Sequence, residues 1–418
     1  MEDMNDDVAE VRPVTPTNWA LFTAISLAVP IVPPGSHPNH PGTIWGPPIN
    51  HIGLSGIGKS QRLKQIARSV GLPGVHVVFT STKQPNSFEG ALVPTSNGVV
   101  IECTLPAARK CIQNGGGFIF FDEVNGASPR TQNAMLSTLS DRQFGDHVVP
   151  PGTRMQCAMN PLERSAGGFV LSAPMANRMG HVNYPTPSAA EWGDYVNGVQ
   201  EHVPLLLDCE GRVRTGWDDS WRITNALLQG FIRNVPSSVF VNQPEADSPH
   251  SSGAWPSYRT WYWALCAITT CRILLDKKTQ DTQAAEFVHA LCGEATAAQW
   301  VKWLVDADLP DPADMLHHGW TPDEIRVDRS YAALNSMTDY VINIAKSDRA
   351  TGIALAEKSW RILERALNTS VADLTATCAS KLHNAKLGRQ DTNAATAAAA
   401  GDVIYRLTQA GYTKLAST

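Results

Sequence analysis

The chain has 418 residues, a hydrophobic content of 43% and a formal net charge of −5. This length predicts two or three domains, and the composition is typical of a globular protein with a large core. The negative net charge argues against a predominantly basic surface for nucleic acid, although it leaves a local basic groove open. Charged residues make up only 17% of the chain, below the average of roughly 25%, which hints at surface covered by other subunits.

The cysteines and the N-terminal apolar run bear on the compartment. The eight cysteines form no CxxC pair, so we interpret them as buried hydrophobic residues in a reducing cytoplasm. Residues 18–32 are mostly apolar, but the run follows acidic residues, is too short to span a membrane and ends at Pro33 and Pro34. We therefore expect a helix packed on the core, with no membrane segment and no signal peptide. The acidic residues 1–16 are expected to be frayed.

The most informative motif is the sequence GLSGIGKS at residues 53–60, which fits the phosphate-binding loop G-x-x-x-x-G-K-[ST]. Glycines let backbone N–H groups curl around a phosphate, the lysine can reach the β- and γ-phosphates, and the serine hydroxyl can bind Mg²⁺. The helix that follows would point its N-terminal dipole at the anion. The residues predicted to bind nucleotide are Gly53, Ser55, Gly56, Ile57, Gly58, Lys59, Ser60 and Gln61.

The segment after this loop fits the motif more clearly than the segment before it. Residues 60–72 have the apolar periodicity of a helix, and Val75–Phe79 is predicted to be a buried strand. The strand that should lead into the loop is less clear, because only Ile49–Ile52 lie between Pro48 and Gly53. We expect this strand to be short or irregular.

A second motif lies about 60 residues downstream, where Phe118–Phe121 is followed by Asp122 and Glu123. A buried strand of this kind delivers carboxylates to the C-terminal edge of a sheet, where ligands bind. This is the Walker B pattern, in which Asp122 would hold Mg²⁺ and Glu123 would orient and polarise the attacking water. The alternative is an apolar strand that ends in exposed acids.

The remaining pattern divides the chain into four predicted segments. Strands alternate with helices over residues 50–190, which predicts a three-layer αβα core, and the pattern is helical beyond about 205. Residues 33–50 and 237–257 are rich in turn residues and are predicted to be loops. Further helices are expected at 258–276, 329–347, 351–367 and from Asp402. The predicted domains are 1–49 (N-terminal helix and lead-in), 50–205 (ATPase core), 206–310 (helical lid) and 311–418 (helical C-terminal extension).

Finer motifs occur in a characteristic order along the core: QPNSFEGALVP at 84–94, SPRTQNAML at 128–136, DRQFGD at 141–146, MQCAMNP at 155–161 and APMANRM at 173–179. With the two motifs above, they resemble the MoxR-like branch of the AAA+ ATPases over about residues 50–185. The resemblance extends less closely to WPSYRTW at 255–261, which looks like the sensor-2 region of a helical lid. It implies an AAA+ P-loop NTPase fold that is followed by this lid.

The resemblance also implies roles for three polar residues. Asn160 matches sensor 1, whose amide orients water or contacts the γ-phosphate, although an Asn before Pro161 could instead cap a turn. Arg178 matches the arginine that reaches a neighbouring subunit's nucleotide, where it would stabilise charge on the phosphoryl oxygens. Arg259 matches sensor 2, acting either within its own subunit or across an interface. For both arginines the alternative is a surface residue, in an ion pair or at a helix start.

Other features of the chain are interpreted with the same family in mind. In related proteins an insertion such as 84–102 forms a β-hairpin that faces the pore of a ring, and residues 99–101 could be one of its strands. The loop carries Ser55 where many relatives have Pro, and Trp45 in the unusual lead-in could contact the adenine. His317 and His318 lack further metal ligands nearby, so we expect them to lie in a solvated turn.

Together these features predict a Mg²⁺- and ATP-dependent AAA+ ATPase that works as a homo-oligomeric ring, and the resemblance implies a hexamer. No N-K-x-D guanine-binding motif occurs, which favours ATP over GTP. The family suggests chaperone-like remodelling of a partner protein, which can carry a von Willebrand factor A domain. Two alternatives remain: a nucleic-acid motor or restriction and defence component of McrB type, and a scaffold that binds nucleotide without hydrolysing it.

Overall fold

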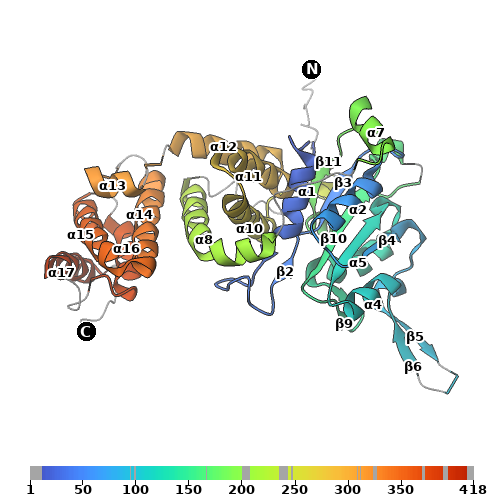
Figure 1. Cartoon of the computed structure of the whole chain (residues 1–418), viewed down its shortest axis with the longest axis horizontal. Coiled ribbons are helices and arrows are strands. Elements are labelled where there is room, and N and C mark those ends of the chain that lie inside the picture. Colours follow the sequence, from blue (N-terminus) through green and yellow to red (C-terminus); the bar gives the residue numbers. More distant parts are fainter. Residues whose placement is uncertain are drawn as a thin grey trace, which may run out of the picture. The chain divides into compact units, whose positions relative to one another are not determined.

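The computed structural model describes residues 12–94, 96–97, 100–165, 167–199, 208–234, 243–245, 248–307, 309–310, 312–322, 327–369, 372–388 and 394–411. The chain divides into two compact units. The first consists of Met1–Trp217 and Ser237–Trp300, and the second of Asp218–Pro236 and Val301–Thr418 (Figure 1).

The first unit is built on a parallel sheet, which has five strands among the described residues, in the order β11-β3-β10-β7-β4. Its strands are β3 (Ile49–Ile52), β4 (Val75–Phe79), β7 (Gly117–Asp122), β10 (Thr153–Met159) and β11 (Gly180–Asn183). The predicted α/β core is thus confirmed. The uncertain strand before the phosphate-binding loop is β3, which is short but lies between two neighbours. Because all the strands are parallel, their carboxyl ends form one edge of the sheet.

Helices cover both faces of this sheet. On one face, Ile119 and Phe121 of β7 share an apolar cluster with Met135 and Leu139 of α5 (Pro129–Asp141) and Cys111 of α4 (Pro106–Gln113). The opposite face is covered by α1 (Trp19–Ala28) and α2 (Lys59–Ser69), which contact each other. Alternate residues of a strand point to opposite faces, so a strand buried on both sides is continuously apolar, as in β7.

The helix α1 lies in the position that the sequence predicts. Every one of its residues is buried, and Asn18 caps its first turn by accepting a hydrogen bond from Leu21 N at 3.0 Å. The apolar run does not continue as helix, because β1 (Pro30–Ile31) pairs with β2 (Ile44–Trp45) instead. Among the described residues, no helix is both long enough and apolar enough to cross a membrane.

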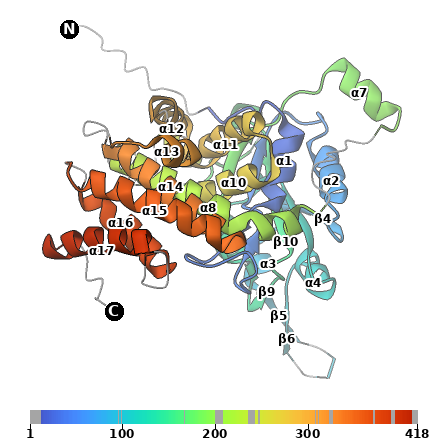
Figure 2. The same cartoon turned by 60° about the vertical axis from the view of Figure 1, so that its left-hand side comes forward.

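Two short antiparallel hairpins extend from the core. One consists of β5 (Ala91–Pro94) and β6 (Val100–Cys103), within the predicted insertion, and it projects from the first unit in both views (Figures 1 and 2). Its Leu92 is 75% exposed, whereas Val99, predicted to be in a strand, lies outside the described residues. The other hairpin pairs β8 (Gln143–Phe144) with β9 (His147–Val148).

The rest of the described chain is helical, as predicted. After the sheet come α7 (Ala189–Val196), α8 (Cys209–Asn234), α10 (Tyr258–Leu274), α11 (Lys277–Cys292) and α12 (Glu294–Ala307). The second unit continues with α13 (Pro312–His318), α14 (Val327–Ser347), α15 (Arg349–Ala366), α16 (Ala372–Asn384) and α17 (Ala394–Gln409). Its core surrounds the fully buried Trp360 of α15. The predicted loop at 237–257 lies partly outside the described residues and contains a 3₁₀ turn at Pro249–Ser252.

Two local predictions are wrong. Part of the acidic N-terminal segment is ordered, because Val14 forms a parallel bridge with Val182 and Pro13 O accepts a hydrogen bond from Asn183 Nδ2 at 2.7 Å. An unpaired strand edge offers backbone partners even to a polar segment. His317 and His318 are exposed, but they lie in the last turn of α13 and not in a loop.

Candidate nucleotide site

The phosphate-binding loop joins β3 to α2. Its backbone turns through Gly56 and Gly58, whose φ angles are +79° and +90°, a region that residues with a Cβ rarely enter. Helix α2 then begins at Lys59, with no side chain capping its first turn. The free N–H groups at this helix start, together with the helix dipole, form an arrangement that suits an anion.

Lys59 is held in place at the centre of the loop. Its ammonium donates hydrogen bonds to Gly53 O at 2.6 Å, to Leu54 O at 2.8 Å and to Asn160 Oδ1 at 3.2 Å. Burial lowers the pKa of Lys59, while the carboxylates of Asp122 and Glu123 oppose this shift. The cation is therefore partly desolvated and stands between the loop and the carboxyl end of β10.

Ser60 and Asp122 lie together, as the two motifs predict. Ser60 Oγ donates a hydrogen bond to Asp122 Oδ2 at 2.7 Å, and Asp122 Oδ1 accepts one from Glu123 N at 3.0 Å. Ser60 and Asp122 thus supply a hydroxyl and a carboxylate, the hard oxygen donors that Mg²⁺ prefers. The donor set therefore fits a magnesium ion that is shared with a phosphate.

Glu123 has a strained backbone conformation. Its φ and ψ are 57° and 47°, so a non-glycine residue occupies the left-handed region, and such strain often marks functional positions. Thr80 Oγ1 contacts the carbonyl oxygens of both Asp122 and Glu123, at 2.9 and 2.6 Å. Ser81 Oγ donates to Glu123 Oε2 at 2.7 Å, which fixes the direction of the exposed carboxylate.

The sequence analysis missed Thr80 and Ser81. They follow β4, whose last residue Phe79 pairs with Asp122 across the sheet, so they reach the same edge as the carboxylates. The hydroxyl-rich run Thr80–Thr82 after a buried strand was the available signal.

Asn160 stands at the carboxyl end of β10, beside Lys59. Its backbone oxygen accepts a hydrogen bond from Asn125 Nδ2 at 3.2 Å, and Asn125 O accepts one from Phe169 N at 2.7 Å. The side-chain amide therefore faces the loop and is not used to cap a local turn.

A cavity of about 770 Å³ adjoins the phosphate-binding loop. Such a volume is typical of small-molecule sites. One wall consists of the loop and the first turns of α2, and the other consists of the segment that follows β11 and includes α7. The lining residues are Gly56, Ile57, Gly58, Gln61, Arg62, Gln65, Thr186, Pro187, Ser188, Ala189, Glu191, Trp192, Asp194, Tyr195 and Val199.

The structure brings Arg178 and Arg259 together. Asn177, which precedes Arg178, donates to Trp255 O at 3.2 Å and accepts from Ser257 Oγ at 2.9 Å, so the end of α6 (Ala173–Ala176) is tied to the start of α10. Arg178 donates to Pro174 O at 2.8 Å. Burial lowers the pKa of Arg178, and the positive charge of Arg259 lowers it further. Two like charges thus share one surface.

This arginine pair lies far from the phosphate-binding loop of its own chain. Arg178 precedes β11, whose first residue Gly180 pairs with Ile49, the first residue of β3. The phosphate-binding loop follows Ile52, at the other end of the same strand. A strand of four residues is about 13 Å long, so the backbone at Arg178 and the phosphate-binding loop lie at opposite ends of about one strand length.

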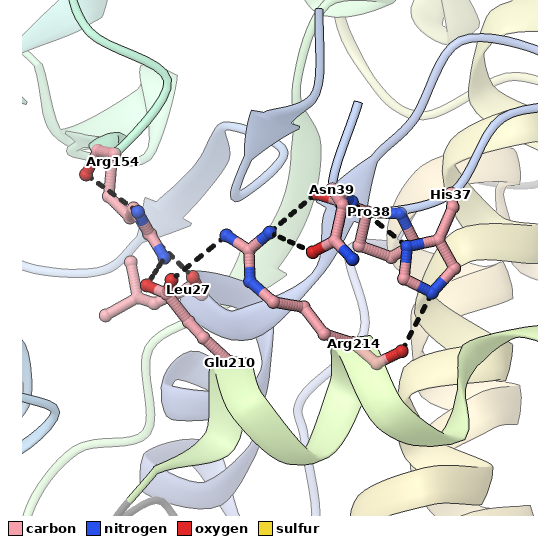
Figure 3. A network of polar contacts seen from close by, with 8 residues as sticks. Leu27, His37, Pro38, Asn39, Arg154, Glu210 and Arg214 are labelled. Atoms are coloured by element: carbon pink, nitrogen blue, oxygen red, sulfur yellow. Dashed lines mark hydrogen bonds and ion pairs between the residues drawn. The ribbon is translucent and has the colours of Figure 1, made fainter. Parts of the chain in front are cut away.

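Trp45 is not near the cavity, contrary to its suggested contact with adenine. It is buried beside Pro151, which precedes β10, and its ring lies 5.2 Å from the guanidinium of Arg154 and 5.0 Å from that of Arg214. Glu210 forms ion pairs with both arginines (Figure 3). The lead-in loop therefore holds the start of α8 against the amino edge of the sheet.

Figure 3 shows how this cluster continues into the lead-in. Arg214 donates to Pro38 O at 2.9 Å and to Asn39 Oδ1 at 2.8 Å, and its own backbone oxygen contacts His37 Nε2 at 2.9 Å. Burial lowers the pKa of Arg154, and Glu210 opposes the shift. The cluster around Trp45 is thus a structural clamp between β10, the lead-in and α8.

Residues 52–187 match the model of the AAA domain of the dynein-related subfamily. The crystal structure of a "putative ATPase" from Cytophaga hutchinsonii ATCC 33406 is similar to 68% of this chain and 87% of that one, with 13% identity and a TM-score of 0.44. Among curated proteins, none matches the chain.

Proposed function

We propose that this protein is a ring-forming ATPase that hydrolyses ATP at sites shared between neighbouring subunits. The observation that carries the proposal is the division of the site between two edges of one sheet. Lys59, Ser60, Asp122 and Glu123 lie at the carboxyl edge, whereas the arginine pair lies at the amino edge. This division supports a site whose two halves come from neighbouring chains.

The order of the strands predicts which side of β3 the phosphates and the nucleoside of a bound nucleotide would lie on. The loop follows β3, and the carboxylates follow β7, two positions away on the side of β10. The terminal phosphate and its metal ion belong on that side. The nucleoside then extends toward β11, on the other side of β3, where the cavity of about 770 Å³ begins at the loop itself.

Ser60 and Asp122 would hold Mg²⁺, which when bound neutralises charge on the phosphate oxygens. Lys59 binds the β- and γ-phosphates from the opposite side of the loop. Glu123, fixed by Ser81, holds the attacking water and accepts its proton, and Asn160 orients that water. Lys59 would exchange one of its three hydrogen bonds, to Gly53 O, Leu54 O or Asn160 Oδ1, for a phosphate oxygen.

The arginine pair would complete the site of the next subunit. A cation placed at the γ-phosphate stabilises the charge that develops during phosphoryl transfer. The sequence leaves open whether Arg259 acts within its own subunit or across an interface. Because Arg259 lies beside Arg178 at the amino edge, we propose that both act on the neighbour. The like charges beside each other would be neutralised by the neighbour's nucleotide.

The finer assignments rest on the resemblance of the sequence to the MoxR-like AAA+ proteins. We propose a hexamer that remodels or activates a partner protein in the cytoplasm, and a separate partner with a von Willebrand factor A domain fits this role. The projecting β5–β6 hairpin, with Leu92 exposed, suits contact with a polypeptide in the pore. Movement of this hairpin would couple hydrolysis to remodelling.

The decisive experiment is complementation between two inactive variants. Arg178→Ala keeps an intact carboxyl edge, and Glu123→Gln keeps an intact amino edge. Each should hydrolyse ATP at least about 100-fold more slowly than the wild type. In a randomly mixed ring about one site in four combines the two intact halves, so mixing should restore activity to roughly that fraction.

The concentration dependence of turnover gives an independent check. The rate per subunit should rise with protein concentration, because dilution separates the two halves of each site. Failure of the mixture to recover any activity, with both variants assembled, would overturn the shared-site proposal. Turnover that is independent of both concentration and Arg178 would do the same.

A further inference from the structure

Arg62 lies on the cavity side of α2, three residues beyond Lys59. Its guanidinium is 5.0 Å from the ring centroid of Trp19 and 5.7 Å from that of Tyr184. These two rings lie 4.7 Å from each other and are nearly perpendicular, at 76°. The distances from the guanidinium to each ring and between the two rings are similar, so both rings lie on the same side of the guanidinium. The remaining side borders the cavity, which Arg62 lines.

The aromatic support behind Arg62 is rigid. Trp19 is 3% exposed, and its indole Nε1 donates to His51 Nδ1 at 3.0 Å. His51 in turn contacts Gln156 Oε1 through Nε2 at 2.9 Å, and Gln156 Nε2 donates to Ser26 Oγ at 3.2 Å. The ring against which Arg62 packs is thus held by hydrogen bonds to β3, β10 and α1.

A carboxylate fixes the guanidinium from the side of α7. Arg62 Nη2 lies 3.6 Å from Glu191 Oε1, and the Arg62 side chain is only 17% exposed. Glu191 also closes the capping box of α7 with Ser188, and hydrogen bonds from Ser188 lower its pKa. The carboxylate therefore stays charged and in place, which limits rotation of the guanidinium plane.

Position along the sheet separates Arg62 from the phosphates. Its neighbours Tyr184 and Glu191 follow β11, whereas Asp122 follows β7, on the opposite side of β3. Along α2, Arg62 is also about 4.5 Å further from the helix start than Lys59, at a rise of 1.5 Å per residue. The part of a nucleotide nearest Arg62 is consequently the nucleoside.

We propose that Arg62 binds the nucleoside moiety of the nucleotide by stacking its guanidinium plane against the base. This inference rests on the proposed nucleotide-binding function and adds a residue that the phosphate-binding motif does not include. Guanidinium planes stack well on flat aromatic rings, and an arginine backed by two aromatic side chains presents such a plane without further ordering.

The opposite wall of the cavity supports the same ligand. Trp192 and Tyr195 of α7 line the cavity, yet they are 65% and 49% exposed. Helix α7 contains no buried residue and stands away from the sheet in both views (Figures 1 and 2). A planar base between Arg62 and these rings would cover apolar surface that is otherwise in contact with water.

The test compares ATP with inorganic tripolyphosphate, which has the phosphates but no nucleoside. Binding of both is measured by calorimetry, with Mg²⁺, for the wild type, Arg62→Ala, Arg62→Lys and Arg68→Ala. Arg62→Ala should weaken ATP binding about 10- to 100-fold, a range typical of the loss of one stacking contact, and leave tripolyphosphate unchanged. Arg62→Lys keeps the charge but not the plane and should lose most of the same affinity.

Arg68→Ala is the matched control, because it removes an exposed arginine of the same helix outside the cavity and should leave both affinities unchanged. Equal losses for ATP and tripolyphosphate would show that Arg62 acts on phosphates or on the fold. Retention of ATP affinity in Arg62→Ala, or its full rescue by lysine, would likewise overturn the inference. Absence of ATP binding by the wild type would instead overturn the proposed function on which the inference rests.

Discussion

The two edges of the parallel sheet differ in the chemistry that they carry. The carboxyl edge gathers a lysine, two carboxylates, an asparagine and three hydroxyls, most of them joined to one another by hydrogen bonds. The amino edge gathers arginines: Arg178 beside Arg259, and Arg154 in the clamp with Glu210. The first edge is organised to bind phosphate and metal. The second offers positive charge that its own chain cannot bring to that site.

This difference teaches that the same strands can serve two active sites. In the proposed function, β3, β7 and β10 end near groups for the chain's own nucleotide, and β11 begins near the arginines proposed to serve the neighbour's. A ring is the closed arrangement in which every subunit supplies both edges once, since contacts of this head-to-tail kind close when the rotation permits.

The largest expected effect is that of Glu123→Gln at the carboxyl edge. The amide cannot accept the proton of the attacking water, so kcat should fall at least about 100-fold, whereas ATP affinity should change little. Steady-state turnover and equilibrium binding of ATP separate the two quantities. Hydrolysis at the wild-type rate by this variant would show that the carboxyl edge is not the catalytic one.

A second prediction concerns the buried histidines that support both edges. Burial lowers the pKa of His51 and of His181 to about 4, from an ordinary value of 6.5. The folded state therefore requires both imidazoles to be neutral. Their contribution is fully present above pH 6.5, and it is lost as the pH falls from 6.5 toward 4, with about 3 kcal/mol at stake for each histidine.

Thermal unfolding measured between pH 7.5 and 4 tests this prediction. A His181→Gln variant should show a shallower loss of stability on acidification than the wild type. His40→Gln is the control, because His40 is exposed on the surface. An unchanged slope in His181→Gln would contradict the assignment.

At the amino edge, Glu210→Gln should destabilise the clamp. Arg154, whose side chain is 3% exposed, would lose its carboxylate partner, but the 43% exposure of Glu210 allows water to compensate in part. We expect the free energy of unfolding to fall by about 1–3 kcal/mol, measured with urea. Glu357→Gln, whose partner Arg361 is 63% exposed and four residues away on the same helix, should cost less than about 0.5 kcal/mol. Equal effects of the two variants would refute the clamp.

The smallest predicted effect is that of Ser81→Ala. Loss of the hydrogen bond to Glu123 frees the carboxylate to rotate, so kcat should fall by about 10-fold while KM for ATP stays constant. Thr82→Ala is the matched control, because Thr82 Oγ1 contacts only Phe79 O at this turn. If the two variants have the same kcat, Ser81 does not position Glu123.

The sequence predicted those parts of the fold in which local pattern and tertiary structure agree. The strand of Phe118–Phe121 is apolar at every position, and the glycines of the loop suit only a few backbone conformations, so both were located correctly. Lys59, Ser60, Asp122 and Asn160 lie together because their motifs follow strands that share one edge.

What could not be predicted depends on register and on contacts distant along the chain. Ser81 contacts Glu123 only because Phe79 pairs with Asp122, a register that no local pattern sets. Arg62 has the spacing of an exposed helical residue, and its aromatic partners come from α1 and from the end of β11. Trp45 was placed near adenine for its position before the loop, whereas Arg154 and Arg214 hold it at the opposite edge.

Helix α8 has a consequence for how the protein is made. Its residues up to Trp217 belong to the first unit and those from Asp218 to the second, and the second unit resumes only at Val301. During synthesis the ribosome therefore produces one helix of the C-terminal unit before it completes the first. The part of α8 from Asp218 onward cannot pack in its own unit, and its apolar face stays exposed, until residues 237–300 and the later helices have emerged. The nascent chain is thus most open to aggregation, or to capture by a chaperone, in this interval.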